Sequence, residues 1–303
     1  MPIHPAFVPL LPVLLMVPAI SAQQATQSVN DVDVIQATTD ANDRMTVPVR
    51  VGNKGPFNFL IDTGSQNTVV SSALANQLSL QPNAKARLVG VAGEQTVNTV
   101  SIDQMDLGTR SYYSVRAPTL ERSNIGADGI LGLDSLQGQR VLIDFRKGVI
   151  LVSDAKTLGG NRGFDIVVTA RRRSGQLIMT DAKIDGVKVS VIIDTGAEYS
   201  IGNRALQDAL RNRSPQGQAM LRSVTGQEIL ADLALARSLM IDDIQFSNVL
   251  VAYADSPPFK VLGLDKKPAL FLGMRDMRSL ERIAIDFSTR RIYFDMPDAA
   301  FPD

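Results

Sequence analysis

The chain has 303 residues, enough for one large domain or two domains of ordinary size. Its composition is that of a globular protein, and 31 Lys and Arg residues balance 31 Asp and Glu residues, so net charge gives no reason to expect nucleic acid as a partner. There is no cysteine, and the only histidine is His4. For a mature chain without His4, these counts exclude Ser-His-Asp and Cys-His catalysis, Cys/His zinc sites and disulfides. We expect no metal and no cofactor, and a chemistry based on carboxylates, hydroxyls, amines or backbone groups.

The N-terminus has the pattern of a secretory signal. The run AFVPLLPVLLMVPAI over residues 6–20 is shorter than the roughly 20 residues of a membrane-spanning helix, and prolines interrupt it. Small residues follow at Ser21 and Ala22, which predicts a signal peptide over residues 1–22 and a periplasmic or secreted mature chain without a membrane span. The lack of Lys or Arg before the run is atypical, and the alternative is an uncleaved anchor or a misassigned start. Residues 23–43 are polar and predict a tether.

One pattern of residues then occurs twice. Each copy has an alternating strand, a glycine-bearing turn and an unbroken apolar run that ends in Asp-Thr-Gly. The first copy is MTVPVRVGNKGPFNFLIDTGS over residues 45–65, and the second is MTDAKIDGVKVSVIIDTGA over residues 179–197. The triplets begin at Asp62 and Asp194. An internal repeat of this length predicts a duplicated structural unit.

The features that follow each triplet also occur in the same order. They are a short helix (residues 71–80 and 203–213), a hairpin with a central glycine (Gly93 and Gly226), two apolar residues before a glycine (Gly132 and Gly273), and a closing strand pair (from Val141 and from Ile283). In the second copy Gly263 competes with Gly273. We prefer Gly273 because its spacing to Asp286 mirrors the spacing from Gly132 to Asp144.

These repeats predict an all-β protein with two lobes related by a pseudo-two-fold axis and with short helices. The N-terminal lobe is expected over residues 44–155 and the C-terminal lobe over residues 164–303. The segment KTLGGNRG over residues 156–163 is polar and glycine-rich, and is expected to link them.

The chemistry is predicted from the two aspartates. An isolated charge at the end of an apolar strand is costly, but two carboxylates that a pseudo-dyad brings together can share one proton. The ionised member can then take a proton from a water that attacks a peptide carbonyl, while the protonated member hydrogen-bonds the carbonyl oxygen. Asp62 and Asp194 are therefore the candidate acid–base pair.

The rest of each triplet suits the same task. Gly64 and Gly196 allow a sharp turn that brings backbone N–H groups to the carboxylates. Thr63 and Thr195 carry hydroxyls that can hydrogen-bond across the axis and join the two loops.

The segments FLIDTGS and VIIDTGA, each followed by a glycine hairpin and an apolar-apolar-glycine element, resemble the retropepsin-type aspartic proteases, in particular the bacterial members with two such units in one chain. The resemblance implies that Asp62 and Asp194 are catalytic, that the hairpins around Gly93 and Gly226 are flaps over a bound peptide, and that Gly132 and Gly273 lie behind the aspartates. It further implies a peptide or protein substrate and a monomer with a pseudo-dimeric site.

Two departures refine this resemblance. Neither hairpin has a tyrosine near its tip, so two retroviral-like flaps are expected in place of a single pepsin-like flap. The residue after the triplet is Ser65 in one copy and Ala197 in the other, so only Ser65 offers a hydroxyl to its aspartate.

The function predicted from the sequence is thus that of an aspartic endopeptidase. A peptide-binding module with the same cleft and no catalysis is the alternative, since fold alone does not decide function. A protease that cuts only its own chain or one dedicated partner is not distinguished from the first prediction. Asp144 and Asp286 also form a matched pair, but they lack a following glycine and are expected to be structural.

Overall fold

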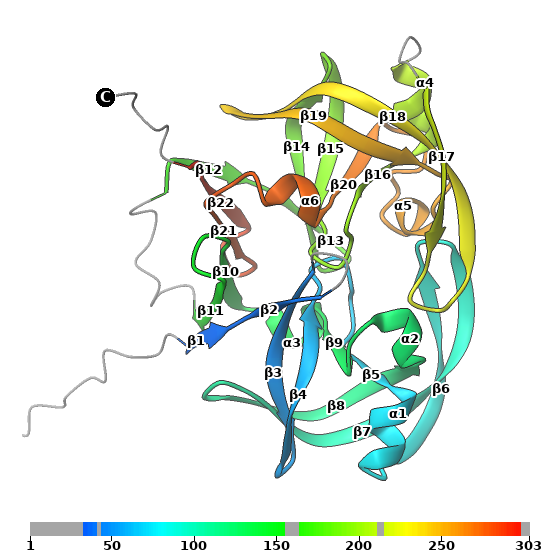
Figure 1. Cartoon of the computed structure of the whole chain (residues 1–303), viewed down its shortest axis with the longest axis vertical. Helices are drawn as coiled ribbons and strands as arrows, with labels where there is room; N and C mark the ends of the chain where they lie inside the picture. The colour runs from blue at the N-terminus through cyan, green and yellow to red at the C-terminus, as the bar shows by residue number, and fades with distance from the viewer. Residues whose placement is uncertain (1–32, 41–43, 155–163, 211–214, 298–303) are drawn as a thin grey trace, which may run out of the picture. The chain divides into compact units, whose positions relative to one another are not determined.

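The computed structural model describes residues 33–40, 44–154, 164–210 and 215–297. The predicted signal peptide over residues 1–22 and the predicted linker over residues 156–163 lie outside these ranges. Within them most residues lie in strands, and no helix exceeds six residues, so the prediction of an all-β fold is confirmed (Figure 1). None of the described helices has the length and apolar composition needed to cross a membrane.

The N-terminal lobe is built on an eight-stranded sheet. Its strands are β2 (Thr38–Thr39), β3 (Met45–Val51), β4 (Lys54–Ile61), β5 (Val69–Ser71), β6 (Gln81–Gly90), β7 (Gly93–Leu107), β8 (Arg110–Leu120) and β9 (Gly129–Leu131). Their order across the sheet is β2-β3-β4-β9-β5-β8-β7-β6, with an additional pairing of β3 with β7. The helices of this lobe are α1 (Ser72–Gln77), α2 (Arg122–Ile125) and α3 (Leu133–Leu136).

The C-terminal lobe repeats this arrangement strand for strand. Its strands are β13 (Arg171–Arg173), β14 (Gln176–Ile184), β15 (Val187–Ile193), β16 (Ser200–Gly202), β17 (Pro215–Arg222), β18 (Glu228–Ile241), β19 (Ile244–Tyr253) and β20 (Ala269–Leu272), and its helices are α4 (Arg204–Ala209), α5 (Pro257–Val261) and α6 (Met274–Met277). The order β13-β14-β15-β20-β16-β19-β18-β17 matches the first lobe position by position. The parallel pairs also correspond, since β4–β9 and β5–β8 have counterparts in β15–β20 and β16–β19. The duplication read from the sequence is therefore present in the sheet topology.

A six-stranded antiparallel sheet joins the two lobes. Its strands are β1 (Asp33–Gln36), β10 (Gln139–Asp144), β11 (Val149–Asp154), β12 (Ile166–Thr169), β21 (Arg282–Asp286) and β22 (Arg291–Asp295), in the order β1-β11-β10-β21-β22-β12. In its central pair, which is β10 and β21, Leu142 lies opposite Ala284. Two residues away on one side an arginine lies opposite an aspartate (Arg140 and Asp286), and two residues away on the other side the same pairing occurs in reverse (Asp144 and Arg282). The pseudo-two-fold axis passes between Leu142 and Ala284.

The segment expected to be a tether is partly strand. Residues 33–36 form β1, which pairs with β11 in the central sheet, and Thr38 and Thr39 pair with β3. The burial pattern of β1 alternates, with Ile35 buried and Val34 exposed. This alternation is too short to stand out in the sequence, and the strand is stabilised by a partner more than 100 residues away.

The apolar runs before the triplets are unbroken because both faces of those strands are buried. In β4, Phe59 and Ile61 belong to the main core, whereas Leu60 faces a separate small cluster. In β15, Ile193 belongs to the main core and Ile192 faces the matching cluster of the second lobe. The strands therefore end at the triplets with packing on both sides.

The second pair of aspartates has the structural role expected for it. Asp286 forms a buried ion pair with Arg140 of the other lobe and accepts backbone N–H bonds from Ser288 and Thr289. Asp144 accepts the backbone N–H of Lys147 in the corresponding turn. Each carboxylate thus closes the turn of its own hairpin.

Candidate active site

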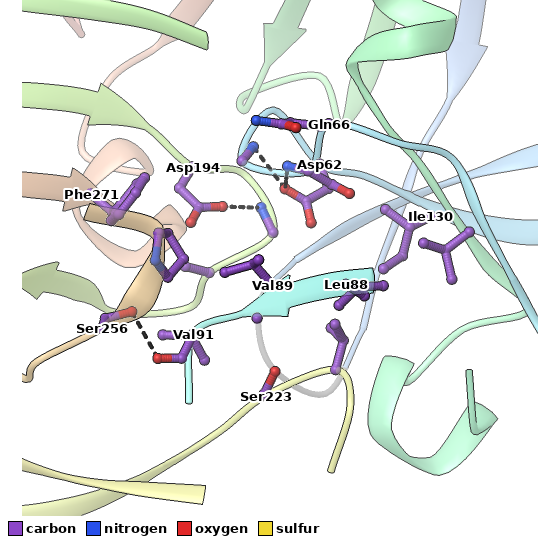
Figure 2. Close-up of a pocket in the computed structure, with 18 of the residues that line it drawn as sticks. Asp62, Gln66, Leu88, Val89, Val91, Ile130, Asp194, Ser223, Ser256 and Phe271 are labelled. Carbon is purple, nitrogen blue, oxygen red and sulfur yellow. Dashed lines mark hydrogen bonds between the residues drawn. The ribbon is translucent and has the colours of Figure 1, made fainter. Parts of the chain in front are cut away.

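The two triplets lie at the ends of equivalent strands, in loops that meet at the pseudo-two-fold axis. Asp62 follows β4 and donates its N–H to the carbonyl of Leu131 at 3.1 Å, and Asp194 follows β15 and donates to the carbonyl of Leu272 at 3.0 Å. Each aspartate is therefore fixed by the apolar-apolar-glycine element of its own lobe. Figure 2 shows the two side chains next to each other at the cleft.

The threonines of the triplets join the two loops. The Thr63 hydroxyl donates to the Ile193 carbonyl at 2.8 Å, and the Thr195 hydroxyl donates to the Ile61 carbonyl at 2.7 Å. Each hydroxyl also accepts the backbone N–H of the other threonine, at 3.0 Å and 3.3 Å. Both threonines are buried, so these four bonds between lobes are shielded from water.

The glycines of the triplets leave room for the opposite carboxylate. A Cβ atom built on Gly64 would lie 2.5 Å from Oδ1 of Asp194, and one on Gly196 would collide in the same way with Asp62. Any other residue at either position would push the two carboxyl groups apart. The requirement for glycine here is a close approach of side chains from the other lobe.

The glycines behind the triplets serve a comparable purpose. A Cβ atom on Gly132 would collide with the backbone of Asn67, and one on Gly273 with the backbone of Tyr199. The preference for Gly273 over Gly263 is consistent with this packing, because Gly273 directly follows β20.

The residues that follow the triplets lie in equivalent loops, but the expected role of Ser65 differs. Its hydroxyl donates to the Asn67 carbonyl at 2.9 Å and not to Asp62. The backbone carbonyls of Ser65 and Ala197 accept N–H bonds from the helices behind them, Leu133 and Met274 respectively. Ser65 therefore stabilises its own loop, and the idea that its hydroxyl contacts the aspartate is wrong.

The two carboxyl groups differ in their electrostatic surroundings. Oδ1 of Asp62 accepts N–H bonds from Gly64 at 2.8 Å and Ser65 at 3.0 Å, whereas Oδ1 of Asp194 accepts a longer bond of 3.1 Å from Gly196. Burial raises the pKa of Asp62, while these N–H groups and the charge of Arg44 oppose the rise. Burial and the charge of Asp62 raise the pKa of Asp194 to about 8. The surroundings therefore favour ionisation of Asp62 over ionisation of Asp194.

A cavity of about 690 Å³ extends from this pair between the lobes. The triplet loops form one side of it, and two hairpins close the other side: residues 86–91 from β6 and the segment after it, and residues 220–224 from β17 and the turn after it (Figure 2). Both β6 and β17 are edge strands of their sheets. Among the described residues, no group of three or more His, Cys, Asp or Glu side chains is arranged to hold a metal ion.

The predicted flap glycines lie at the tips of these two hairpins, Gly93 as the first residue of β7 and Gly226 in the turn before β18, and the tips meet. A Cβ atom on Gly93 would lie 2.8 Å from the Gln227 amide, and one on Gly226 would lie 2.7 Å from Asn124 of the other lobe. The Gln227 amide also donates to the Glu94 carbonyl at 3.5 Å. Two hairpins therefore lie over one cavity, and their action as flaps over a bound peptide stays a prediction.

Each hairpin tip packs on the opposite lobe. Val91 of the first hairpin contacts the C-lobe cleft cluster (Ile178, Ile192, Ile201, Phe259, Leu262, Leu264, Ala269 and Phe271). Val224 of the second hairpin contacts the N-lobe cleft cluster (Leu60, Val69, Val97, Leu120, Ile125, Ala127 and Ile130). The first contact has an added hydrogen bond, since the buried Ser256 hydroxyl donates to the Val91 carbonyl at 2.7 Å (Figure 2). The two hairpin tips therefore cover the cavity.

Three residues at this site were not singled out from the sequence. Arg44, Gln176 and Ser256 all line the cavity and are almost completely buried. The spacing of the repeat could have identified the first two. Arg44 and Gln176 are 132 residues apart, as are Asp62 and Asp194, so they occupy equivalent positions in the two copies. Ser256 has no such signal, since its partner Val91 lies 165 residues away in a different lobe.

Comparison with known proteins agrees with this geometry. A model of the aspartyl protease family matches residues 47–135 and 180–275, which together make up more than half of the chain and correspond to the two lobes. The protein belongs to the aspartyl protease family, so the resemblance to retropepsin-type enzymes is confirmed at the level of the family and its two-lobed fold. No curated protein matched the chain.

The raised pKa of Asp194 predicts a stability that falls with pH. An unfolded aspartate has a pKa near 3.8, so between about pH 4 and pH 8 the native state binds one more proton here than the unfolded state does. The free energy of unfolding should decrease across this window by at most about 1.4 kcal/mol per pH unit from this group. Asp194→Asn should flatten the slope and be more stable than wild type at pH 8.

Urea unfolding at pH 5, 6, 7 and 8 measures this slope. Asp208→Asn, which changes an exposed aspartate on α4, is the matched control and should keep the wild-type slope. Parallel stability curves for wild type and Asp194→Asn would contradict the protonation assigned here.

The bond from Ser256 to Val91 predicts a measurable change in the first hairpin. Ser256→Ala removes the donor and should raise backbone amide exchange over residues 86–95 about fivefold, the effect of losing roughly 1 kcal/mol. Hydrogen–deuterium exchange with mass spectrometry gives this rate. Ser247→Ala, an exposed serine on β19, should leave it unchanged. Exchange in Ser256→Ala that equals wild type would show that the bond does not hold the hairpin.

Proposed function

We propose that this protein is an aspartic endopeptidase that hydrolyses peptide bonds with a water activated by Asp62 and Asp194. The observation that carries the proposal is the arrangement of these two carboxyl groups. They lie against each other across the pseudo-two-fold axis, with each fitted against the triplet glycine of the opposite lobe. Such a pair, sharing one proton at the base of an enclosed cavity, is suited to general acid–base catalysis without a metal or a covalent intermediate.

The different surroundings of the two groups support a division of roles. Asp62, which has the shorter N–H bonds and lies in the field of Arg44, acts as the base that takes a proton from the water. The water oxygen bonds to the peptide carbonyl carbon, and Asp194 donates its proton to the carbonyl oxygen. The diol then collapses as the carbon–nitrogen bond breaks. The departing nitrogen takes the proton that Asp62 received, and one diol hydroxyl returns its proton to Asp194 as it becomes the carbonyl of the new carboxyl group.

The hairpins supply the means of holding a peptide. Both β6 and β17 are edge strands whose residues line the cavity, so each has backbone N–H and C=O groups that an extended peptide can pair with. The cleft clusters on either side offer apolar surface to alternate side chains. The substrate is therefore a peptide or protein segment bound in extended form.

The proposal predicts that both aspartates are required. Asp62→Asn and Asp194→Asn should each reduce kcat/KM by at least about a thousandfold, and the double variant should lose little more, because the pair acts as a unit. The assay is cleavage of a diverse peptide library by residues 23–303 over pH 3 to 8, with mass spectrometry of the products. Asp208→Asn is the matched control and should keep wild-type activity. A single dyad variant with near wild-type activity would overturn the assignment.

A folded wild-type chain that retains library peptides without cleaving them would support the non-catalytic binding module instead. Retention is measured by capturing the chain and sequencing the peptides that remain bound.

We also propose that one chain contains the whole site, since both triplets come from the same polypeptide. Specific activity should then stay constant on dilution from about 10 μM to about 10 nM, a range in which many dimers dissociate. Activity measured over this range, together with sedimentation of the same samples, tests the proposal. A fall in specific activity that follows a monomer–dimer equilibrium would contradict it.

A further inference from the structure

Gln176 occupies an unusual position beside the candidate dyad. It is the first residue of β14 and lines the cavity, and only 4% of its surface is exposed. Its side-chain nitrogen donates to the Gly64 carbonyl of the opposite lobe at 2.6 Å. Because a carbonyl can only accept, this bond fixes which end of the amide is nitrogen. The oxygen Oε1 must therefore point elsewhere.

That oxygen has no hydrogen-bond partner among the described residues, although it is buried. A buried acceptor without a donor destabilises the fold, so native structures rarely leave one unpaired. The bond from Nε2 to Gly64 also polarises the amide and makes Oε1 a stronger acceptor. Gln176 lines the cavity, so a donor from a bound molecule that reaches Oε1 can satisfy this acceptor.

Strand register identifies the equivalent position in the first lobe. Thr46 lies opposite Leu60 in the β3–β4 pair, and Ile178 lies opposite Ile192 in the β14–β15 pair. Leu60 and Ile192 each precede their triplet aspartate by two residues. The residues two places before Thr46 and Ile178 are Arg44 and Gln176, so these two side chains occupy equivalent corners of the cleft.

The two corners have opposite hydrogen-bonding character. Arg44 carries only donors, and its Nε and Nη2 are bound to Asp40, with Nη2 also donating to the Ile125 carbonyl. Gln176 presents a free acceptor. A peptide can cross the cleft in two opposite directions. A main-chain N–H that faces Oε1 of Gln176 in one direction would lie beside Arg44, which has only donors, in the other direction. The pseudo-symmetry of the cleft is broken at these positions.

We propose that Oε1 of Gln176 accepts a hydrogen bond from a main-chain N–H of the bound peptide and thereby sets the direction in which the peptide lies across the dyad. The inference rests on the proposed function, because it requires a peptide in the cavity. A main-chain N–H is the donor favoured here because an extended peptide provides one at every residue, whatever its side chains.

The test is a scan of the best peptide from the library, in which each backbone amide is replaced in turn by an ester. An ester has no N–H, so one position should lose about tenfold in kcat/KM with wild type. The same ester should lose less than twofold with Gln176→Met, which has a similar length and neither donor nor acceptor. The loss of the bond to Gly64 affects amide and ester substrates alike, so the ratio isolates the contact made by Oε1.

Gln77→Met, which changes an exposed glutamine on α1, is the matched control and should show the wild-type ester profile. If the chain retains peptides without cleaving them, dissociation constants of the amide and ester forms replace kcat/KM. Cleavage with no ester position that depends on Gln176 would overturn this inference and leave the proposed function intact. Retention without cleavage, again with no such position, would overturn this inference together with the proposed catalysis. A folded chain that neither cleaves nor retains any library peptide would overturn both.

Discussion

The contact on which the rest of the site depends is the approach of two carboxyl groups across the pseudo-two-fold axis. Like charges at such close range in a buried site are unfavourable. The raised pKa of Asp194 and the backbone N–H groups that donate to Asp62 both relieve this repulsion. The hydroxyls of Thr63 and Thr195 hold the loops together from behind, each bonded to the opposite lobe. Glycine at positions 64 and 196 is required by the same approach.

The duplication explains most of the architecture, and several departures from it lie at the candidate active site. The strand orders of the two lobes match, and the central sheet has its axis between Leu142 and Ala284. Yet the pair Arg44 and Gln176 differs in charge and in hydrogen bonding. Shorter N–H bonds to Asp62 than to Asp194 add a second asymmetry. These differences are the basis on which we propose separate acid and base roles for Asp194 and Asp62.

The hairpins also form contacts between the two lobes. Val91 and Val224 each pack on the cleft cluster of the opposite lobe, and Ser256 bonds the first tip in place. Apolar contacts of this kind are weak individually and are lost when a hairpin lifts. The hairpin tips thus cover the cavity by packing on the cleft clusters, which are the surfaces that a bound peptide would contact.

The sequence by itself determined the β class, the duplication, the two triplets and the position of the hairpins. These features are local: apolar runs, turn glycines and short motifs in a repeated order, whose physical requirements act within a few residues. Tertiary structure decided the rest. The contacts of Gln176 with Gly64, Ser256 with Val91 and Arg140 with Asp286 join residues more than 100 positions apart, and β1 is a strand only because β11 lies beside it. No local pattern encodes such contacts, because they arise only when two lobes fold against each other.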